Sequence, residues 1–256
     1  LERDQQAGRQ VQLRLLPPAA AHKGDYSIAR HILPSLYLSG DFIDYAYLSE
    51  RYLAFYLADV SGHGASSAFV TVWLKHLANH LVRDQGLFAD AASFESGPDE
   101  MLRQINAELH ETRLNHHLTL FVGAIDTHTH KMHYAVGGHL PMPVLITPEG
   151  ANFLGGSGKP VGIFHDCQWQ VYEMALPEKF LLASFSDGVL ETLPPQDLCE
   201  KEAYLLDLLS TQASRSDAIF DAESSLKIVC DLLGLDKIQD APDDIAVMTV
   251  ARNASQ

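Results

Sequence analysis

Acidic residues at four positions of this chain lie at the ends of apolar segments that predict β-strands. They are Asp41, Asp59, Asp187 and the pair Asp243 and Asp244. Carboxylates held close together repel one another, and a bound cation compensates that repulsion. Mg²⁺ and Mn²⁺ prefer oxygen ligands, and two such ions can activate a water and clamp a phosphoryl group. A shared metal centre for phosphoryl chemistry therefore explains the four positions together.

The first two of these positions close a predicted β-hairpin. The polar run 49–51 separates two apolar and aromatic segments, which is typical of strand, turn and strand. Folding the hairpin back brings Asp41 near Asp59. Gly62 and Gly64 follow, and glycines let the backbone turn tightly and present its carbonyl oxygens as ligands. For this pair alone, an ordinary hairpin with two solvated aspartates is the simpler alternative, so the metal interpretation depends on the later acidic positions.

Length and composition limit the classes of protein that remain. The chain has 256 residues, of which 46% are hydrophobic, and this predicts one large or two small globular domains. A net charge of −15 argues against non-specific binding to nucleic acid or to anionic membranes, and it suits a site that collects cations. Three scattered cysteines predict neither a disulfide framework nor a zinc site, so a reducing, cytoplasmic location is expected. No apolar run reaches the roughly 18 residues of a membrane span.

The hydrophobic periodicity predicts an α+β layered domain rather than an alternating βαβ fold. Strands come first, then helices, then many strands, further helices and a last strand. The expected helices are 1–16, 65–82, 99–112, 198–209 and 219–233, with a loop at 86–98 and an alanine-rich turn at 19–21. The expected strands are 26–33, 45–48, 52–58, 118–126, 131–136, 144–147, 169–176, 180–185 and 245–250.

The first expected helix has a narrow apolar stripe of Ala7, Val11 and Leu15, and Pro17 with Pro18 ends it. So thin a stripe needs a partner, because an isolated helix of this length is marginal in water. The partner could be the chain's own domain, a second copy or an upstream domain. The chain begins with Leu, so we expect it to be an excised piece of a longer protein.

The acidic motifs also resemble a known family. In order along the chain, they are Gly40–Asp44, Asp59–Gly64, Ser186–Glu191 and Asp243–Ile245. They are similar to the motifs of the metal-dependent protein phosphatases (PPM, type 2C), above all of the bacterial SpoIIE and RsbU-like branch. Three supporting segments resemble the same branch: Arg9–Pro18, Tyr134–Pro141 and Gly158–Gly162. The resemblance covers nearly the whole chain.

This resemblance implies a fold and a domain organisation. The implied fold is α+β, with two antiparallel β-sheets in a sandwich flanked by helices, in four αββα layers. Residues 19–252 would form the phosphatase domain. Residues 1–18 would form a linker helix from an upstream regulatory domain, either a sensor or the receiver of a response regulator. The same helix could join two copies in a homodimer.

The resemblance also implies a site with two Mn²⁺ or Mg²⁺ ions and a bridging water that attacks the phosphoryl group. The implied metal ligands are Asp41, Asp59, the carbonyl of Val60, Asp187, Asp243 and Asp244. Asp59 would bridge both ions, and Asp59 and Asp187 would be the catalytic residues. Asp187 and Asp243 would complete one ion's site, and Asp41 with Val60 the other. Asp244 would either support a ligand or serve as a further one, while Asp44 is expected to be structural.

Three functions are compatible with these features. The first is a metal-dependent serine/threonine phosphatase in bacterial signalling, acting on a phosphoprotein such as an anti-sigma factor antagonist. The second is a weak or inactive phosphatase-like binding module, or an RssB-type adaptor, that acts on a sigma factor or its regulators. The third is a structural β-sandwich with incidental aspartates. All four acidic motifs are present, which favours the enzyme, because a pure binder has no need of carboxylates that repel one another.

Overall fold

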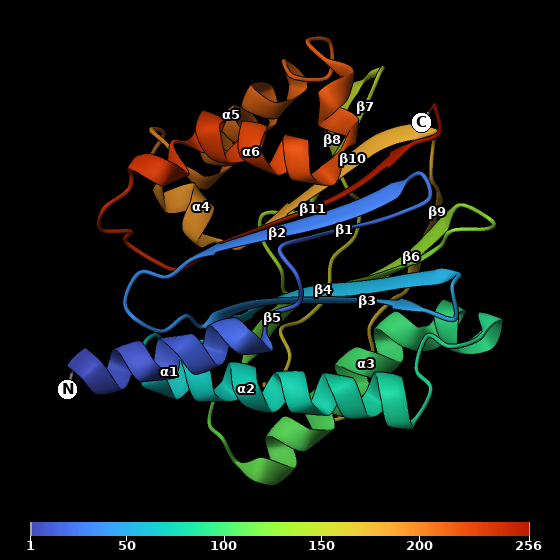
Figure 1. The fold of residues 1–256 in the computed structure, drawn as a ribbon. Coiled ribbons are helices and arrows are strands. Elements are labelled where there is room, and N and C mark those ends of the chain that lie inside the picture. The colour runs from blue at the N-terminus through green and yellow to red at the C-terminus, as the bar shows by residue number, and fades with distance from the viewer. Residues whose placement is uncertain (1, 256) are drawn as a thin grey trace. The chain divides into compact units, whose positions relative to one another are not determined.

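A computed structural model describes residues 2–255 and divides them into two compact units (Figure 1). Unit 1 comprises the described residues up to Pro17, together with Leu36–His139 and Gly156–Leu176. Unit 2 comprises Pro18–Ser35, Leu140–Gly155 and residues 177–255. Each unit has one antiparallel sheet with helices beside it. The predicted α+β class, with two antiparallel sheets flanked by helices, is therefore confirmed.

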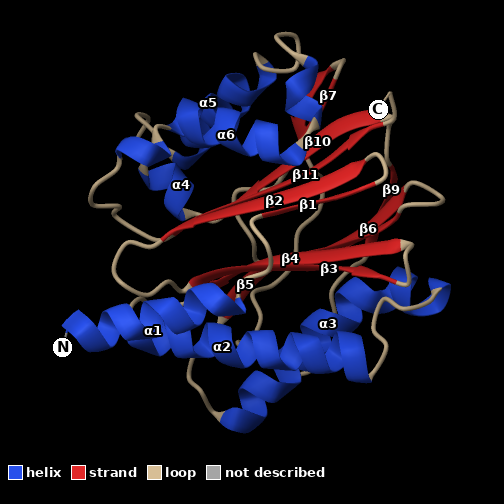
Figure 2. Cartoon of the chain, viewed as in Figure 1, coloured by secondary structure: helices blue, strands red, loops and turns tan. Residues whose placement is uncertain are grey.

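Unit 1 has a five-stranded sheet in the order β3-β4-β5-β6-β9. The strands are β3 (Asp41–Leu48), β4 (Tyr52–Val60), β5 (Leu118–Asp126), β6 (Lys131–Gly137) and β9 (Tyr172–Ala175). The helices are α1 (Glu2–Leu15), α2 (Ala65–Asn79), the π-helix η1 (His80–Asp84) and α3 (Ala91–Thr112). Figures 1 and 2 show these helices on one side of the sheet, and α2 and α3 contact it directly.

Alternation along the strands decides which side chains face those helices. On β4, Ala58 and Val60 belong to the core that Leu74 of α2 and Leu102 of α3 complete. Because successive side chains of a strand point to opposite faces, Asp59 lies on the other face of the sheet. The sequence pattern thus buries one face under the helices and directs Asp59 away from them.

Unit 2 has a six-stranded sheet in the order β1-β2-β11-β10-β7-β8. The strands are β1 (Ala20–Lys23), β2 (Tyr26–Leu33), β7 (Val144–Thr147), β8 (Gly150–Phe153), β10 (Lys179–Phe185) and β11 (Ile245–Asn253). The helices are α4 (Gly188–Glu191), α5 (Leu198–Ser210), η2 (Asp217–Phe220), α6 (Ala222–Leu233) and η3 (Leu235–Lys237). None of the helices within residues 2–255 is both long and apolar enough to cross a membrane.

Helix α3 differs most from the prediction, because it begins at Ala91 rather than at residue 99. A capping box starts it: the Ser93 N–H donates to Asp90 Oδ1 over 2.8 Å, and the Asp90 N–H donates to Ser93 Oγ over 3.2 Å. Pro98, which we expected to mark the start, lies inside the helix. The predicted loop at 86–98 is therefore wrong beyond residue 90, because a local cap outweighs the proline.

Helix α1 packs on unit 1 through a face that the apolar stripe did not predict. Gln12 is buried, a Cβ atom at Gly8 would lie 3.5 Å from Leu38 Cδ2, and Val11 is 58% exposed. The Gln12 amide donates to the Ser39 carbonyl over 2.7 Å, and the Ser39 N–H donates back to Gln12 Oε1 over 3.1 Å. The same amide nitrogen bonds Thr71 Oγ1 of α2. The hydrogen bonds of Gln12 to Ser39 and Thr71 therefore help to hold α1 in place. Residue 1 of the predicted helix lies outside the described residues.

Candidate metal centre

Asp41 and Asp59 are direct partners across the β3–β4 ladder of unit 1. Direct cross-strand partners place their side chains on the same face of the sheet, and like charges in that arrangement destabilise it. Asp41 is only 2% exposed, and Asp59 is half-buried. A hard divalent cation would offset this repulsion, because it takes carboxylate oxygens as ligands. The pair therefore fits the predicted metal.

The turn before Asp41 leaves space beside the carbonyl of Val60. The Val60 N–H donates to the Gly40 carbonyl over 3.0 Å, and the Asp41 N–H donates to Ser39 Oγ over 3.0 Å. A Cβ atom at Gly40 would lie 3.1 Å from both the Val60 oxygen and Ser67 Oγ. Glycine thus allows the two strand ends to approach closely, and it keeps the carbonyl that was predicted as a ligand clear of a side chain.

The segment after Asp59 is held in a fixed shape. Gly62 and Gly64 adopt φ values of 87° and 79°, in the left-handed region that favours glycine. The Ser61 N–H donates to the His117 carbonyl over 2.9 Å, which continues the β4–β5 ladder past its last paired residues. His116 bonds the Ser61 carbonyl through Nδ1 at 2.9 Å. The chain leaving Asp59 therefore bends sharply on a rigid support.

In unit 2, the three later aspartates stand at neighbouring strand ends. Asp187 is the second residue after β10, and Asp243 and Asp244 directly precede β11, which pairs antiparallel with β10. The Ser186 N–H donates to the Ala246 carbonyl over 3.0 Å, and the Ala246 N–H donates to Ser186 Oγ over 2.8 Å. These two bonds fix the loop that carries Asp187 beside the pair.

The backbone after Asp187 packs closely against the backbone at Asp244. A Cβ atom at Gly188 would lie 2.0 Å from the Asp244 carbonyl oxygen, so only glycine fits after Asp187 at this place. The pKa of Asp243 is raised, first by its partial burial and then by the negative charges of Asp187, Asp244 and Glu191. Like charges are thus concentrated at this strand end too, and that again suits a cation.

Asp243 and Asp244 differ in their surroundings. Asp244 is buried, and its Oδ1 accepts bonds from the Ser35 N–H over 2.7 Å and from Ser35 Oγ over 2.9 Å. Asp243 is the more exposed of the two, although part of its carboxyl group is shielded from water, and its Oδ1 accepts the Asp244 N–H over 2.8 Å. Asp244 is therefore fixed by Ser35, a support that our reading of the sequence missed, whereas Asp243 accepts its hydrogen bond from its own neighbour.

The predicted site residues thus form two groups, the pair Asp41 and Asp59 in unit 1 and the trio Asp187, Asp243 and Asp244 in unit 2. Within residues 2–255, no three or more histidine, cysteine, aspartate or glutamate side chains stand together as a ready metal site. Each unit by itself brings its own acidic residues to one place, and the polar residues that steady them, such as Ser35, carry no motif of their own.

The family model described as "Stage II sporulation protein E (SpoIIE)" matches residues 49–253, a range that contains Asp59, Asp187 and Asp243 but not Asp41. The chain is also similar to "Phosphoserine phosphatase RsbP" of Bacillus subtilis (strain 168). They are 28% identical over 177 residues, which cover 67% of this chain and 40% of that protein. The chain spans about two fifths of the length of the curated relatives it matches.

Two solved structures share the fold. The SiaA-PP2C domain of Pseudomonas aeruginosa has a TM-score of 0.74 and 15% identity, covering 98% of this chain and 96% of that chain. The catalytic domain of the serine threonine protein phosphatase PstP, in complex with 2 manganese ions, has a TM-score of 0.59 and 15% identity. That match covers 89% of this chain and 98% of the PstP chain. At these identities the likeness concerns the fold alone.

Proposed function

We propose that this chain, which belongs to the Stage II sporulation protein E (SpoIIE) family of PP2C-type phosphatases, is a metal-dependent protein serine/threonine phosphatase domain. The observation that carries the proposal is the direct cross-strand pairing of Asp41 with Asp59, which places two like-charged carboxylates on the same face of the sheet. The manganese ions in the structurally similar PstP domain support a requirement for Mn²⁺ or Mg²⁺.

The proposed ligands of two such ions are the six residues that the family motifs indicate. They are Asp41, Asp59, the carbonyl of Val60, Asp187, Asp243 and Asp244. When bound, two divalent ions supply an activated water and neutralise charge on the phosphoryl group. Asp59 and Asp187 are the proposed catalytic residues: Asp59 would serve both ions, and Asp187 would help to hold one of them.

The chain's own residues prepare these ligands. Ser39 and Gln12 fix the turn that leads into Asp41. Ser35 orients the carboxylate of Asp244 through two hydrogen bonds to one oxygen. A ligand whose orientation is set in advance loses less freedom when it binds, so these contacts support metal affinity.

We infer that the substrate is a phosphoserine or phosphothreonine protein, and an anti-sigma factor antagonist is the specific candidate. The name of the relative, phosphoserine phosphatase, supports the first part. Residues 1–18 would link the domain to an upstream sensor or receiver domain, in the cytoplasm. Ala7 and Val11 of α1 are exposed, and these side chains are the proposed contacts of a homodimer.

Hydrolysis of a generic phosphomonoester, p-nitrophenyl phosphate, tests this function with and without Mn²⁺. We expect phosphate release that depends on Mn²⁺ or Mg²⁺ and disappears with a chelator. Equal release under all these conditions would contradict the proposal. If the chain instead bound a phosphoprotein without releasing phosphate, the inactive binding module or adaptor would be the better account.

A further inference from the structure

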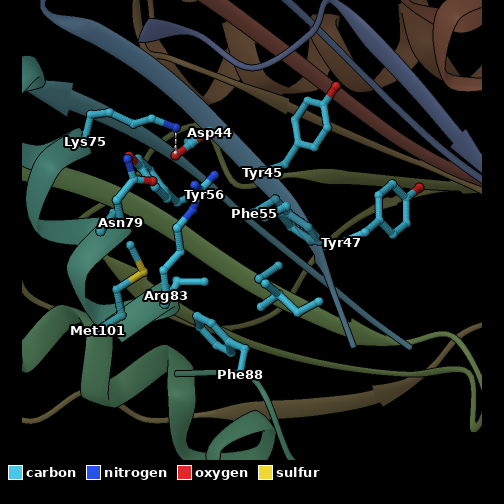
Figure 3. A pocket seen from close by; sticks show the side chains of 15 residues that line it. Asp44, Tyr45, Tyr47, Phe55, Tyr56, Lys75, Asn79, Arg83, Phe88 and Met101 are labelled. Atoms are coloured by element: carbon cyan, nitrogen blue, oxygen red, sulfur yellow. Dashed lines mark hydrogen bonds and ion pairs between the residues drawn. The ribbon is translucent and has the colours of Figure 1, made fainter. Parts of the chain in front are cut away.

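Unit 1 contains a cavity of about 300 Å³ that none of the proposed metal ligands lines. It opens between strands β3 and β4 on one side and α2, η1 and α3 on the other (Figure 3). Its volume is at the lower end of the range of small-molecule sites, roughly 300–1,000 Å³. Its walls combine one cluster of charged side chains with aromatic and aliphatic ones, which is the usual make-up of such sites.

One end of the cavity holds a buried ion pair with spare hydrogen-bonding capacity. Lys75 Nζ donates to Asp44 Oδ2 over 2.7 Å, whereas Asp44 Oδ1 is buried and has no hydrogen-bond partner within residues 2–255. Tyr56 is the direct cross-strand partner of Asp44, and its buried hydroxyl also lacks a partner in that range. Buried polar groups are nearly always hydrogen-bonded, and each one left unmet costs about 1–3 kcal/mol. A ligand that supplies these bonds would recover that cost.

The same end carries an excess positive charge. Lys75 and Asp44 neutralise each other, and Arg83 adds a guanidinium whose charge acts on Asp44. Figure 3 shows Lys75, Asn79 and Arg83 gathered round the carboxylate of Asp44. Arg83 is exposed and forms no ion pair with the described part of the chain. Its guanidinium is therefore available to a carboxylate, which it can bind through two parallel hydrogen bonds.

The other end of the cavity is apolar, and one of the residues that line it has a strained backbone conformation. Phe88 and Met101 line it, below the charged group in Figure 3. Phe88 has φ = 65°, a left-handed conformation that is strained for a bulky residue. A Cβ atom at Gly97 would lie 2.3 Å from its ring, so the ring is packed on the bare backbone of α3. The adjoining wall is the π-helix η1, a feature often found at functional sites.

We propose that this cavity binds a free apolar α-amino acid. The ammonium group would donate to Asp44 Oδ1, and the carboxylate would pair with Arg83 and accept from Tyr56 Oη. The apolar side chain would pack on Phe88 and Met101. An α-amino acid carries a positive and a negative group on one carbon, and this matches a spare carboxylate oxygen and a spare guanidinium at one end of an apolar cavity.

Titration calorimetry on the 256-residue chain tests the assignment with three probes. L-Phenylalanine has all three features, 3-phenylpropionate lacks the ammonium group, and phenethylamine lacks the carboxylate. We expect L-phenylalanine to bind at least about tenfold more tightly than either analogue, because each charged hydrogen bond contributes about 1.5–3 kcal/mol. No heat with L-phenylalanine at millimolar concentration, or equal affinity for 3-phenylpropionate, would overturn the proposal.

Variants locate the binding. Arg83→Gln should weaken L-phenylalanine about tenfold and leave phenethylamine unchanged, since only the carboxylate contact is lost. Asp44→Asn should weaken L-phenylalanine and leave 3-phenylpropionate unchanged. Ala46→Leu adds volume at a half-buried lining position and should abolish binding, whereas Arg215→Gln, at an exposed arginine of unit 2, should bind like the wild type. Binding of L-phenylalanine that survives both Arg83→Gln and Ala46→Leu would place it elsewhere and refute the site.

Discussion

Asp41 and Asp59 face each other across the β3–β4 ladder. Three residues after Asp41 on the same strand, Asp44 forms an ion pair with Lys75. The two carboxylates on β3 therefore differ in the charge that lies next to them. Asp44 has a cation supplied by the chain, whereas Asp41 is opposite another carboxylate. Because alternate residues of a strand point to opposite faces, Asp41 and Asp44 lie on different faces of the sheet. Asp41 shares its face with Asp59, whereas Asp44 lies on the helix side.

Metal binding should stabilise the chain. Mn²⁺ that binds only the folded state adds about 2.7 kcal/mol at a concentration one hundred times its dissociation constant. For a chain of this size that raises Tm by several degrees, at about 2–4 °C per kcal/mol. Asp59→Asn should lose this response and be more stable than the wild type without metal, because one repulsion is removed. Asp207→Asn, at an exposed position of α5, is the control and should respond like the wild type. Melting curves that Mn²⁺ does not shift would contradict the metal site.

Asp243 and Asp244 should respond differently to the same substitution. Asp244→Asn weakens two hydrogen bonds from Ser35 to a buried carboxylate, so it should lower the free energy of unfolding by about 1–3 kcal/mol. Asp243→Asn should change that free energy little and reduce the stabilisation by Mn²⁺. Urea unfolding with and without Mn²⁺ separates the two effects. The assignment of Asp243 as the stronger ligand fails if Asp244→Asn alone removes the metal response.

Gln12 should link helix α1 to the turn before Asp41. Gln12→Ala removes the hydrogen bonds to Ser39 and Thr71, each contributing about 0.5–1.5 kcal/mol, and it leaves the Ser39 groups buried without their partner. We expect lower stability and a lower phosphatase rate than in the wild type. Gln10→Ala, at an exposed position of the same helix, should change neither. Equal rates in the two variants would show that α1 does not support the turn.

His139 should make stability depend on pH. Burial lowers the pKa of His139 from 6.5 to about 4, and neither ring nitrogen has a hydrogen-bond partner within residues 2–255. Between these pH values the unfolded chain binds a proton that the folded chain does not. The free energy of unfolding should therefore fall as pH drops from 6.5 to 4, by about 3 kcal/mol in total.

Comparison with an apolar variant isolates that effect. In His139→Leu the free energy of unfolding should fall less between pH 6.5 and 4, because the variant lacks the proton that the unfolded wild type takes up at His139. His128→Leu, at an exposed position, is the control and should follow the wild-type curve. If His139→Leu and the wild type kept parallel curves through this range, His139 would not be a buried neutral base.

The acidic end of the β3–β4 hairpin could be predicted because local signals agree there. Aromatic and apolar residues flank a polar turn, and this pattern predicted that Asp41 lies near Asp59; the structure shows them as direct partners. The strands that end two residues before Asp187 and begin after Asp244 were equally clear, since both are buried and continuous. No single strand end requires a metal: the four acidic positions together indicated it, and the family resemblance then implied the ligand set.

Other features depend on contacts that periodicity does not encode. The start of α3 depends on the reciprocal bonds of Asp90 and Ser93, which outweigh Pro98. The strands β1 and β8 are only four residues long, and we read the first as part of a turn. Of the predicted stripe of Ala7, Val11 and Leu15, only Leu15 packs against the core within the described residues, because the buried face of α1 is centred on Gln12, a polar residue. In each case a tertiary or capping contact overrides the local pattern.

The substitution Asp59→Asn tests the central claim most directly, because Asp59 is the carboxylate proposed to serve both metal ions. Phosphate release from a phosphoserine protein should be measured for the wild type, Asp59→Asn, Asp187→Asn and the double variant, each with Mn²⁺. We expect the wild type to release phosphate, both single variants to lose nearly all activity, and the double variant to be no worse, because each breaks the same unit. Equal low rates in the wild type and Asp59→Asn would contradict the enzyme and leave a phosphatase-like binding module.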